Sequence, residues 1–373
     1  MQRTAVVGIA VVLATGIFAI PMIPYLASPA DLWVHIEYAK SIHGPADIVS
    51  PHFLFQLLLI AITKVSGLSY NASAIALMSL CYGGMAGIIA ARIRRSVSAA
   101  PPWVILSVSV FVLLASHIFL QTAFKLNFLY GYIAPTVYHN PTQVLSKVLA
   151  LVVMFTYFAL AFKSERANRI YQVLLPVGVV LSAIAKPSFL IAFVPCVCLC
   201  EVYRATSGQW RLAARNLIFV ALPAVVVLAL QFRMTYTAGG NGGGLGLAPF
   251  LVYGGAADVI PKLPASLLFP VVAGVVLRRN GGFNSRMRFT WLLYAIGMII
   301  STCLVEIGPR MMQGNFAWTG QTVTFLLYVE TAIALMAVPG RHAWPAWWAF
   351  GLHVLFGIIW YSAALFLPLG TFL

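Results

Sequence analysis

The sequence predicts an all-α polytopic membrane protein in which residues 1–373 form a single transmembrane domain. The chain is 61% hydrophobic and only 8% charged, which is far more apolar than a soluble domain of this length. Apolar runs of about 15 to 22 residues recur along the whole length, and each suits a helix that crosses roughly 30 Å of hydrocarbon. The short alternating strands that a membrane β-barrel requires are absent from the pattern.

The apolar runs predict about eleven transmembrane helices. The expected crossings are residues 5–26, 71–91, 102–120, 143–162, 170–185, 187–203, 214–232, 263–277, 289–304, 321–338 and 345–366. A further apolar run, residues 51–67, is opened by Pro51 and His52 and closed by Lys64 and Gly67. We expect it to lie in the outer interface as a juxtamembrane helix that does not cross.

The basic residues orient the chain. The formal charge is +15, but the Lys and Arg side chains sit in short loops and form no continuous stripe, so membrane topology explains them better than nucleic acid does. With residues 51–67 outside, 15 of the 23 Lys and Arg residues fall on one side, which the positive-inside rule makes the cytoplasm. The N-terminus is then cytoplasmic, and a bacterial inner membrane is the expected location.

Two outer segments follow from this topology. Residues 28–70 form the first outer loop with its juxtamembrane helices, and residues 233–262 form a Gly-rich outer loop that can serve as a lid. Residues 1–30 also resemble a secretory signal peptide, but about 22 apolar residues exceed the usual signal core and favour a retained helix. The CxCxC at residues 196–200 admits a metal site, yet this spacing on a helix points the thiols in different directions and favours packing.

The first outer loop carries the candidate catalytic residues. On a helix over residues 31–42, Asp31 and His35 share one face, with Tyr38 one turn further. A carboxylate at the bilayer edge beside apolar Trp33 favours a catalytic residue, whereas the alternative for Asp31 is a helix cap. His35 is the candidate helper of Asp31, and its alternative is a hydrogen-bonded interfacial anchor.

Three cations are candidates for binding a phosphate. Lys186 lies in a turn too short to leave the membrane, where a cation is costly unless an anion or a wet cavity meets it; the alternative is snorkelling. Arg310 carries a planar fork that suits phosphate, and the alternative is a pair with Glu306. Lys147 lies one turn inside the fourth crossing and completes the set.

Other polar and aromatic side chains of the outer segments are candidates for substrate contacts. Interfacial anchoring is the alternative role for each of them. They are Tyr38, His52, His139, Asn140, Asn315 and Trp318. Glu330, expected at mid-membrane, is either a structural carboxylate with a polar helix partner or a cavity residue.

The first 100 residues resemble the integral-membrane glycosyltransferases of the GT-C fold, which include protein O-mannosyltransferases and aminoarabinose transferases. The resemblance rests on a first helix, an outer loop that opens on Asp31 in the pattern DxxxHxxYAxxI, the segment "PHFLFQLL" and a crossing that ends in "ARIRR". It implies a polyprenyl-phosphate sugar donor and an acidic catalytic residue in this loop. Only Asp31 fits that position, since Ala30 and Leu32 flank it and no second carboxylate supports a divalent metal.

The expected function is therefore sugar transfer on the outer face, from a polyprenyl-phosphate-linked donor to a lipid-linked or glycan acceptor, without a cofactor and without nucleic acid. Asp31 would deprotonate the acceptor, and Lys186, Arg310 and Lys147 would stabilise the leaving phosphate. Two alternatives stay open: a transporter or flippase for an envelope lipid, and a polysaccharide polymerase or ligase. The first predicts paired charges at mid-membrane.

Overall fold

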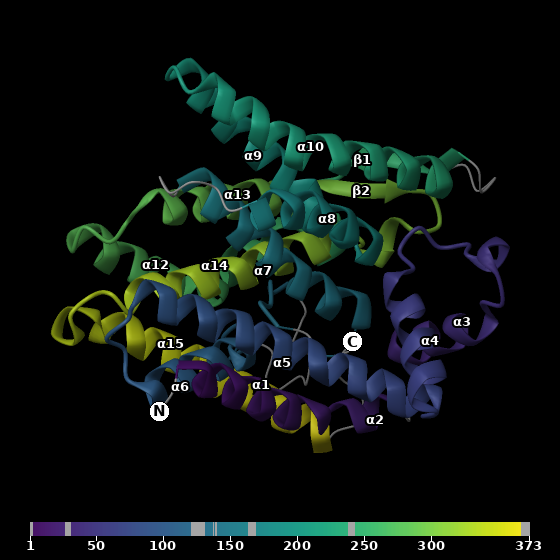
Figure 1. The fold of residues 1–373 in the computed structure, drawn as a ribbon, viewed down its shortest axis with the longest axis horizontal. Helices are drawn as coiled ribbons and strands as arrows, with labels where there is room; N and C mark the ends of the chain where they lie inside the picture. Colours follow the sequence, from purple (N-terminus) through teal and green to yellow (C-terminus); the bar gives the residue numbers. More distant parts are fainter. Residues whose placement is uncertain are drawn as a thin grey trace.

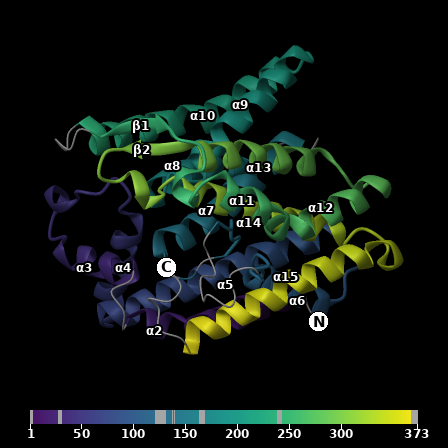
Figure 2. The same ribbon diagram turned by 180° about the vertical axis from the view of Figure 1, so that it is seen from behind.

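The computed structural model describes residues 3–26, 31–120, 131–136, 138, 140–162, 169–237 and 243–366. Within these ranges the chain is a bundle of long helices that run back and forth along one axis (Figure 1; Figure 2 from behind). The predicted all-α class is confirmed, apart from one small sheet described below.

The long helices follow the chain in alternating directions. They are α1 (Arg3–Ala19), α5 (Tyr70–Ser96), α6 (Pro102–Leu114), α7 (Pro141–Phe162), α8 (Arg169–Ala185), α9 (Leu190–Thr206), α10 (Trp210–Phe232), α12 (Leu263–Arg279), α13 (Ser285–Cys303), α14 (Ala317–Leu335) and α15 (Gly340–Phe366). The short helices lie between them and are α2 (Met22–Leu26), α3 (Asp31–Ser41), α4 (Leu54–Ser66) and α11 (Ala256–Val259).

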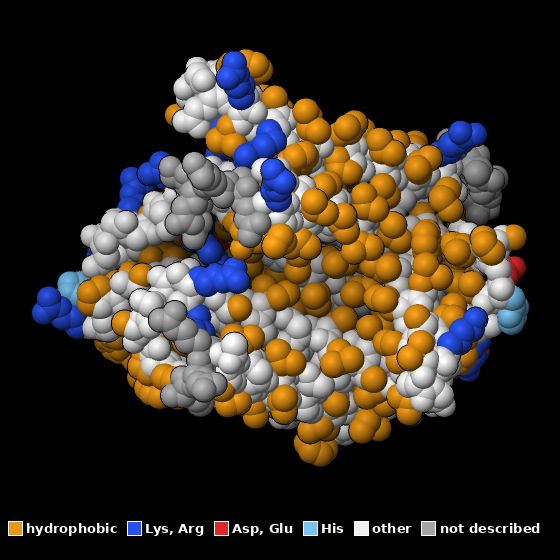
Figure 3. Space-filling model, viewed as in Figure 1, with side chains coloured by type: hydrophobic (Ala, Val, Ile, Leu, Met, Phe, Trp, Pro, Cys, Tyr) orange, Lys and Arg blue, Asp and Glu red, His pale blue; other side chains and the backbone are white. Residues whose placement is uncertain are grey.

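The described chain contains 5 helical segments that are long and apolar enough to cross a membrane. They are Tyr70–Ser96, Pro141–Phe162, Trp210–Tyr236, Ala256–Arg279 and Gly340–Phe366. Figure 3 shows a broad hydrophobic band across the middle of the molecule, as expected for a surface that faces lipid. The larger number of about eleven crossings stays a prediction, because several of the remaining apolar helices are shorter.

The two ends of the bundle differ in chemistry. One end, here called the Asp31 end, holds α3 and α4, on the right in Figure 1. The opposite end, here called the arginine end, holds the last turns of α5, α9 and α12 and the first turns of α10, α13 and α15. In Figure 3 most of the visible Lys and Arg side chains gather at this second end. The bundle therefore has a polarity along its axis.

The expected crossing over residues 102–120 is helical only as far as Leu114. The chain then continues without helix, and its backbone bonds to other helices: Ser116 N donates to His353 O (3.0 Å) and Ile118 N to Ala265 O (3.0 Å). Non-helical backbone at membrane depth is tolerated where protein groups satisfy it. The prediction was wrong here because hydrophobicity alone does not report those long-range partners.

The sheet lies in the Gly-rich segment. Strand β1 (Gly244–Leu247) pairs antiparallel with β2 (Leu304–Ile307), with Gly244 opposite Ile307 and Leu247 opposite Leu304. The strand sequence Gly-Leu-Gly-Leu is short and rich in glycine, which weakens a strand, so its pairing depends on a partner about 60 residues further along the chain. The pairing fixes this segment beside the end of α13, where Ala248 N also donates to Cys303 O (2.9 Å).

Candidate functional site

An asparagine connects a carboxylate and an ammonium group at the Asp31 end. Asn140 Nδ2 donates to Asp31 Oδ2 (2.8 Å), and Lys186 Nζ donates to Asn140 Oδ1 (3.2 Å). Asn140 is only 5% exposed and Lys186 only 9% exposed, so their contact is buried, whereas the contact with Asp31 is partly buried. Three segments far apart in the sequence thus place their functional groups around one amide.

Local sequence explains why Asn140 is held so firmly. Asn140 directly precedes α7, and Pro141 occupies the first helical position, where its fixed φ and missing N–H are favourable. Asn140 Oδ1 accepts from Gln143 N (2.9 Å), which is the bond expected of an N-cap residue. It also accepts from Thr142 Oγ1 (2.9 Å). The cap leaves Nδ2 free to reach Asp31.

Lys186 occupies the tight connection between α8 and α9. Its backbone N donates to Ser182 O (3.0 Å), and its Nζ lies 4.3 Å from the centroid of the Trp318 ring at the start of α14. A desolvated ammonium over an indole face gains a favourable electrostatic contact. The charge is therefore directed inward to Asn140 and Trp318, and not outward as snorkelling would require.

Helix α3 presents Asp31 and His35 on one face. Leu32, Ile36 and Ala39 form the buried face of this short helix, and the helix packs against α4. Asp31 is the first residue of the helix, and its carboxylate reaches across to α7. The spacing of four residues then places His35 one turn below Asp31.

His35 is held by an amide on α4. The side chain of Gln56 lies 2.7 Å from His35 Nδ1, and with its oxygen toward the ring, the amide nitrogen lies 3.3 Å from the carbonyls of Phe53 and His52. In this arrangement Nδ1–H donates and Nε2 keeps its lone pair. Burial, followed by the positive charge of Lys186, lowers the pKa of His35 to about 4, although Asp31 opposes the shift. The imidazole is therefore neutral at pH 7.

His52 lies in the segment that leads into α4 and is also neutral. Burial is the largest cause, and the charges of Lys186 and Arg310 add to it, so that the pKa of His52 falls to about 3. Its Nδ1 is buried and has no hydrogen-bond partner among the described residues. An unpartnered buried ring nitrogen is costly and indicates a place for a polar ligand or an ordered water molecule.

Lys147 lies deeper, on α7. Its Nζ donates to Pro135 O (2.7 Å) and lies 5.3 Å from the centroid of the Phe325 ring. The side chain is only 4% exposed, yet it interacts electrostatically with Lys186. Lys147 therefore lies beneath the cluster, and its direct contacts are with protein groups.

The structure leaves other predicted site residues outside the hydrogen-bonded cluster. Arg310 Nε lies 3.4 Å from Glu306 Oε2, and its side chain is 50% exposed. Asn315 Nδ2 donates to the same carboxylate oxygen, at 2.5 Å. Tyr38 Oη accepts from the backbone N–H groups of Val49 (2.8 Å) and Ser50 (2.9 Å), so it holds the loop in place. His139 lies outside the described residues.

Two glutamines belong to the site although the sequence did not single them out. Gln56 orients His35, and Gln143 Nε2 donates to Trp318 O (2.9 Å) and Thr322 Oγ1 (2.6 Å). Gln143 Oε1 is buried without a partner in the described chain. The available signal was a Gln three residues after the Asn-Pro cap, at the polar start of an otherwise apolar helix.

The arrangement combines a hydrogen-bond-accepting carboxylate, a desolvated cation and two neutral imidazoles in one buried cluster. Such a set can accept a proton at one point and stabilise negative charge at another. Among the described residues no group of three His, Cys, Asp or Glu side chains is placed to hold a metal ion. No protein-family model matches the chain, and a search of curated proteins finds no match either.

Proposed function

We propose that this chain is a membrane glycosyltransferase that moves a sugar from a polyprenyl-phosphate-linked donor to a lipid-linked or glycan acceptor. The observation that carries the proposal is the contact of the buried Asn140 side chain with both Asp31 and Lys186. It supports the proposal because sugar transfer from a lipid phosphate needs a base and a cation a few ångströms apart. The resemblance of the first 100 residues to GT-C enzymes points the same way.

In the proposed reaction, Asp31 takes the proton of an acceptor hydroxyl. The hydroxyl oxygen forms a bond to the anomeric carbon while the bond from that carbon to the phosphate oxygen breaks. The sugar leaves the donor as the polyprenyl phosphate keeps the electron pair. Asn140 holds Asp31 in position during this step, since its own orientation is fixed by the cap of α7.

Lys186 is the proposed partner of the leaving phosphate. Negative charge builds up on the phosphate in the transition state, and a preformed buried cation stabilises that charge without reorganisation. Lys147 adds to the positive potential from below, through its interaction with Lys186. Arg310, already paired with Glu306 and half exposed, would meet the donor at the outer edge of the site.

The neutral histidines would contact hydroxyl groups. His52 Nδ1 is buried without a partner in the described chain, so it can bond a sugar hydroxyl without breaking a protein contact. Gln143 Oε1, which is also buried without a partner in the described chain, can accept a hydrogen bond from a sugar hydroxyl in the same way. Trp318, whose ring stacks over Lys186, offers an apolar face for a sugar ring.

We place the Asp31 end at the periplasmic face of a bacterial inner membrane, with the N-terminus in the cytoplasm. The support is the concentration of arginines at the opposite end, which the positive-inside rule assigns to the cytoplasm (Figure 3). Single cysteines at positions 62 and 94 would test this orientation. An impermeant thiol reagent added from outside should not reach position 94.

The test is incorporation of radiolabelled sugar from a panel of polyprenyl-phosphate donors by the purified protein in detergent. Asp31→Asn should abolish transfer, whereas Glu37→Gln, a carboxylate on the same helix that is exposed and paired with Lys40, should not. Equal transfer by wild type and Asp31→Asn would end the role of Asp31. Failure of the wild-type protein with every donor would instead favour transport.

One observation favours transport of an envelope lipid as the second candidate function. Glu330 lies buried in α14, toward the arginine end and not at the predicted mid-membrane position, and it interacts electrostatically with Arg92 and Arg286, so the charges are paired and buried as a transporter requires. Reconstituted protein that moves a fluorescent polyprenyl-phosphate sugar between leaflets without transferring the sugar would establish this alternative.

A further inference from the structure

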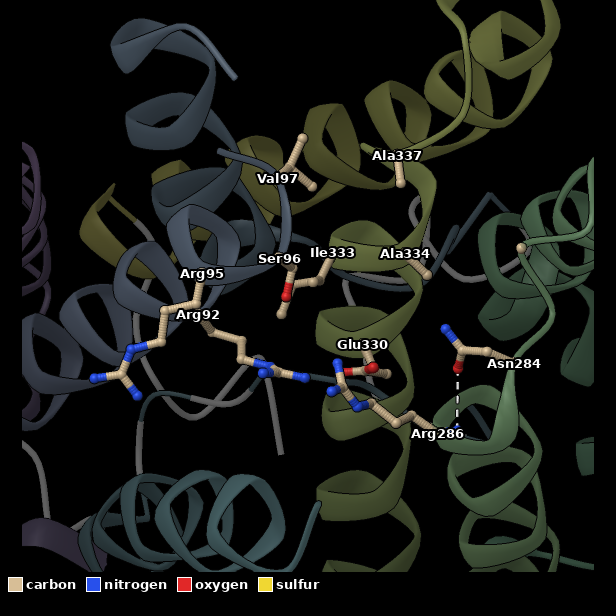
Figure 4. A pocket seen from close by; sticks show the side chains of 11 residues that line it. Arg92, Arg95, Ser96, Val97, Asn284, Arg286, Glu330, Ile333, Ala334 and Ala337 are labelled. Carbon is tan, nitrogen blue, oxygen red and sulfur yellow. Dashed lines mark hydrogen bonds between the residues drawn. The ribbon is translucent and has the colours of Figure 1, made fainter. Parts of the chain in front are cut away.

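A polar cavity lies at the arginine end of the bundle. It encloses about 310 Å³, and its walls come from the last turn of α5, the last turns of α14 and the residues around the start of α13. Figure 4 shows the side chains that line it. They are Arg92, Arg95, Ser96, Val97, Gly282, Asn284, Arg286, Glu330, Ile333, Ala334 and Ala337.

Positive charge dominates this cavity. Two guanidinium groups, those of Arg92 and Arg286, face a single carboxylate, that of Glu330, whereas the Arg95 side chain borders the cavity and donates from Nη1 to Tyr171 Oη (3.4 Å). Figure 4 shows Arg92 and Arg286 directed toward Glu330 from two different helices, and both interact with it electrostatically. One carboxylate cannot neutralise two cations, so the cavity keeps an excess of positive charge where water is scarce.

The hydrogen-bonding groups in the cavity are incompletely used. Arg92 Nε and Nη2 are buried and have no partner among the described residues, and the same holds for Glu330 Oε2. Glu330 is 2% exposed. Buried guanidinium donors without acceptors are costly, and an anion that accepts from them removes that cost.

The start of α13 adds to the same potential. Asn284 Oδ1 accepts from the backbone N–H groups of Arg286 (3.0 Å) and Met287 (3.1 Å), which places the positive end of this helix dipole at the cavity. Val97, Ile333 and Ala337 form an apolar part of the wall. The cavity therefore combines an anion-binding part with an apolar part.

We propose that this cavity is a binding site for a phosphate group, carried either by an anionic lipid or by a water-soluble phosphate. Guanidinium groups match phosphate oxygens in a bidentate geometry, and their donors outnumber what Glu330 can accept. The volume lies at the lower end of the range of small-ligand pockets, about 300 to 1,000 Å³, which suits a phosphate with a small attached group.

The site is separate from the cluster at the Asp31 end. Trp318 and Glu330 lie on the same helix, and twelve residues of α-helix span about 18 Å. The proposal therefore does not depend on glycosyl transfer, and it holds equally for an enzyme and for a transporter. Its occupant would regulate or anchor the protein from the face opposite to the Asp31 end.

The experiment measures the thermal unfolding temperature of the purified full-length protein in two arms. In the first arm inorganic phosphate is titrated at constant ionic strength against chloride, with the protein in a neutral detergent. In the second arm the protein is placed in nanodiscs of phosphatidylglycerol or of phosphatidylcholine. A ligand that binds only the folded state raises the unfolding temperature. Stabilisation in the first arm identifies a soluble phosphate, and stabilisation in the second alone identifies a lipid headgroup.

Variants locate the effect. Arg92→Gln should weaken binding by about tenfold or more, as expected for loss of a charged hydrogen-bond donor, while Arg279→Gln, an exposed arginine at the same end, should not. Glu330→Gln removes the one carboxylate that repels a phosphate and should tighten binding several-fold, a gain that misfolding cannot imitate. The proposal is overturned if neither phosphate nor phosphatidylglycerol stabilises the wild type, or if Glu330→Gln leaves the affinity unchanged.

Discussion

Two buried polar clusters, one around Glu201 and one around Asn140, share helices and differ in how completely they are satisfied. Glu201, 0% exposed on α9, accepts from Tyr157 Oη (2.6 Å) and Asn216 Nδ2 (3.0 Å), and forms an ion pair with Arg204 (2.6 Å). Every one of these contacts ends on another protein group. The cluster ties α7, α9 and α10 together.

The cluster around Asn140 is built differently. It brings Asp31 and Lys186 to one amide, yet His52 Nδ1 and Gln143 Oε1 nearby have no partner in the described chain. Fully satisfied buried networks give a protein rigidity, while unpaired polar atoms in a buried site are retained where a ligand uses them. The comparison assigns Glu201 to stability and the Asn140 cluster to function, and four predictions test that division.

The largest effect on stability is expected for Glu201→Ala. It leaves Arg204 as an uncompensated, largely buried charge and removes the acceptor of Tyr157 and Asn216. Removing one partner of a buried ion pair costs about 3 to 5 kcal/mol of unfolding free energy. Thermal and denaturant unfolding in detergent would measure this loss of unfolding free energy. Glu37→Ala, at an exposed carboxylate, is the control. Transfer activity per folded molecule should not change.

Lys186→Gln should act on turnover and not on the fold. Loss of one preorganised donor costs about 2.7 to 4 kcal/mol of transition-state stabilisation, which is a factor of about 10² to 10³ in kcat. The amide can still donate to Asn140, so the unfolding temperature should stay close to wild type. Lys64→Gln, an exposed lysine at the end of α4, is the matched control. A large drop in unfolding temperature with unchanged kcat would make Lys186 structural.

The histidines should make stability depend on pH. Their folded pKa values, about 4 for His35 and about 3 for His52, lie below the ordinary value of 6.5, so the unfolded chain binds more protons as pH falls below 6.5. The contribution of the neutral histidines to the free energy of unfolding is fully present above pH 6.5. It declines toward pH 4, by on the order of 1 kcal/mol per pH unit for each histidine. Unfolding temperatures at pH 7, 6 and 5 would show the decline, and His52→Gln should reduce its slope. The exposed His342→Gln should leave the slope unchanged.

The smallest effect is expected for Arg310→Gln. Half-exposed ion pairs such as Arg310 with Glu306 contribute about 0 to 1 kcal/mol to stability. Because Arg310 lies at the outer edge of the site, Arg310→Gln should raise the KM for the donor by a few fold and leave kcat near wild type. A fall in kcat as large as that of Lys186→Gln would place Arg310 on the reacting phosphate.

Much of this architecture follows from local sequence. The apolar periods of α3 and α4, the Asn-Pro cap of α7 and the short turn at Lys186 are all properties of neighbouring residues, so their positions could be predicted. The charge pattern likewise predicted a bundle with one basic end. The helix bounds in the structure lie within a few residues of most expected crossings.

Long-range contacts could not be predicted in the same way. Nothing near Asn140 in the sequence reveals that its two amide atoms reach residues 31 and 186, and nothing near Arg310 decides between phosphate and Glu306. The end of α6 at Leu114 and the pairing of β1 with β2 also depend on partners far along the chain. Such contacts are fixed by packing in three dimensions, which a single sequence does not show.

The non-helical stretch after α6 has a consequence for biosynthesis. Ser116 N donates to His353 O, and the His353 ring in turn contacts Ser116 O through Nδ1 (2.6 Å). These partners are separated by more than 230 positions, so a growing chain cannot satisfy Ser116 in this way until α15 has emerged from the ribosome. Translation products that stop before α15 should therefore stay incompletely assembled and be cleared by membrane proteases, even though every residue of the Asn140 cluster has already been synthesised.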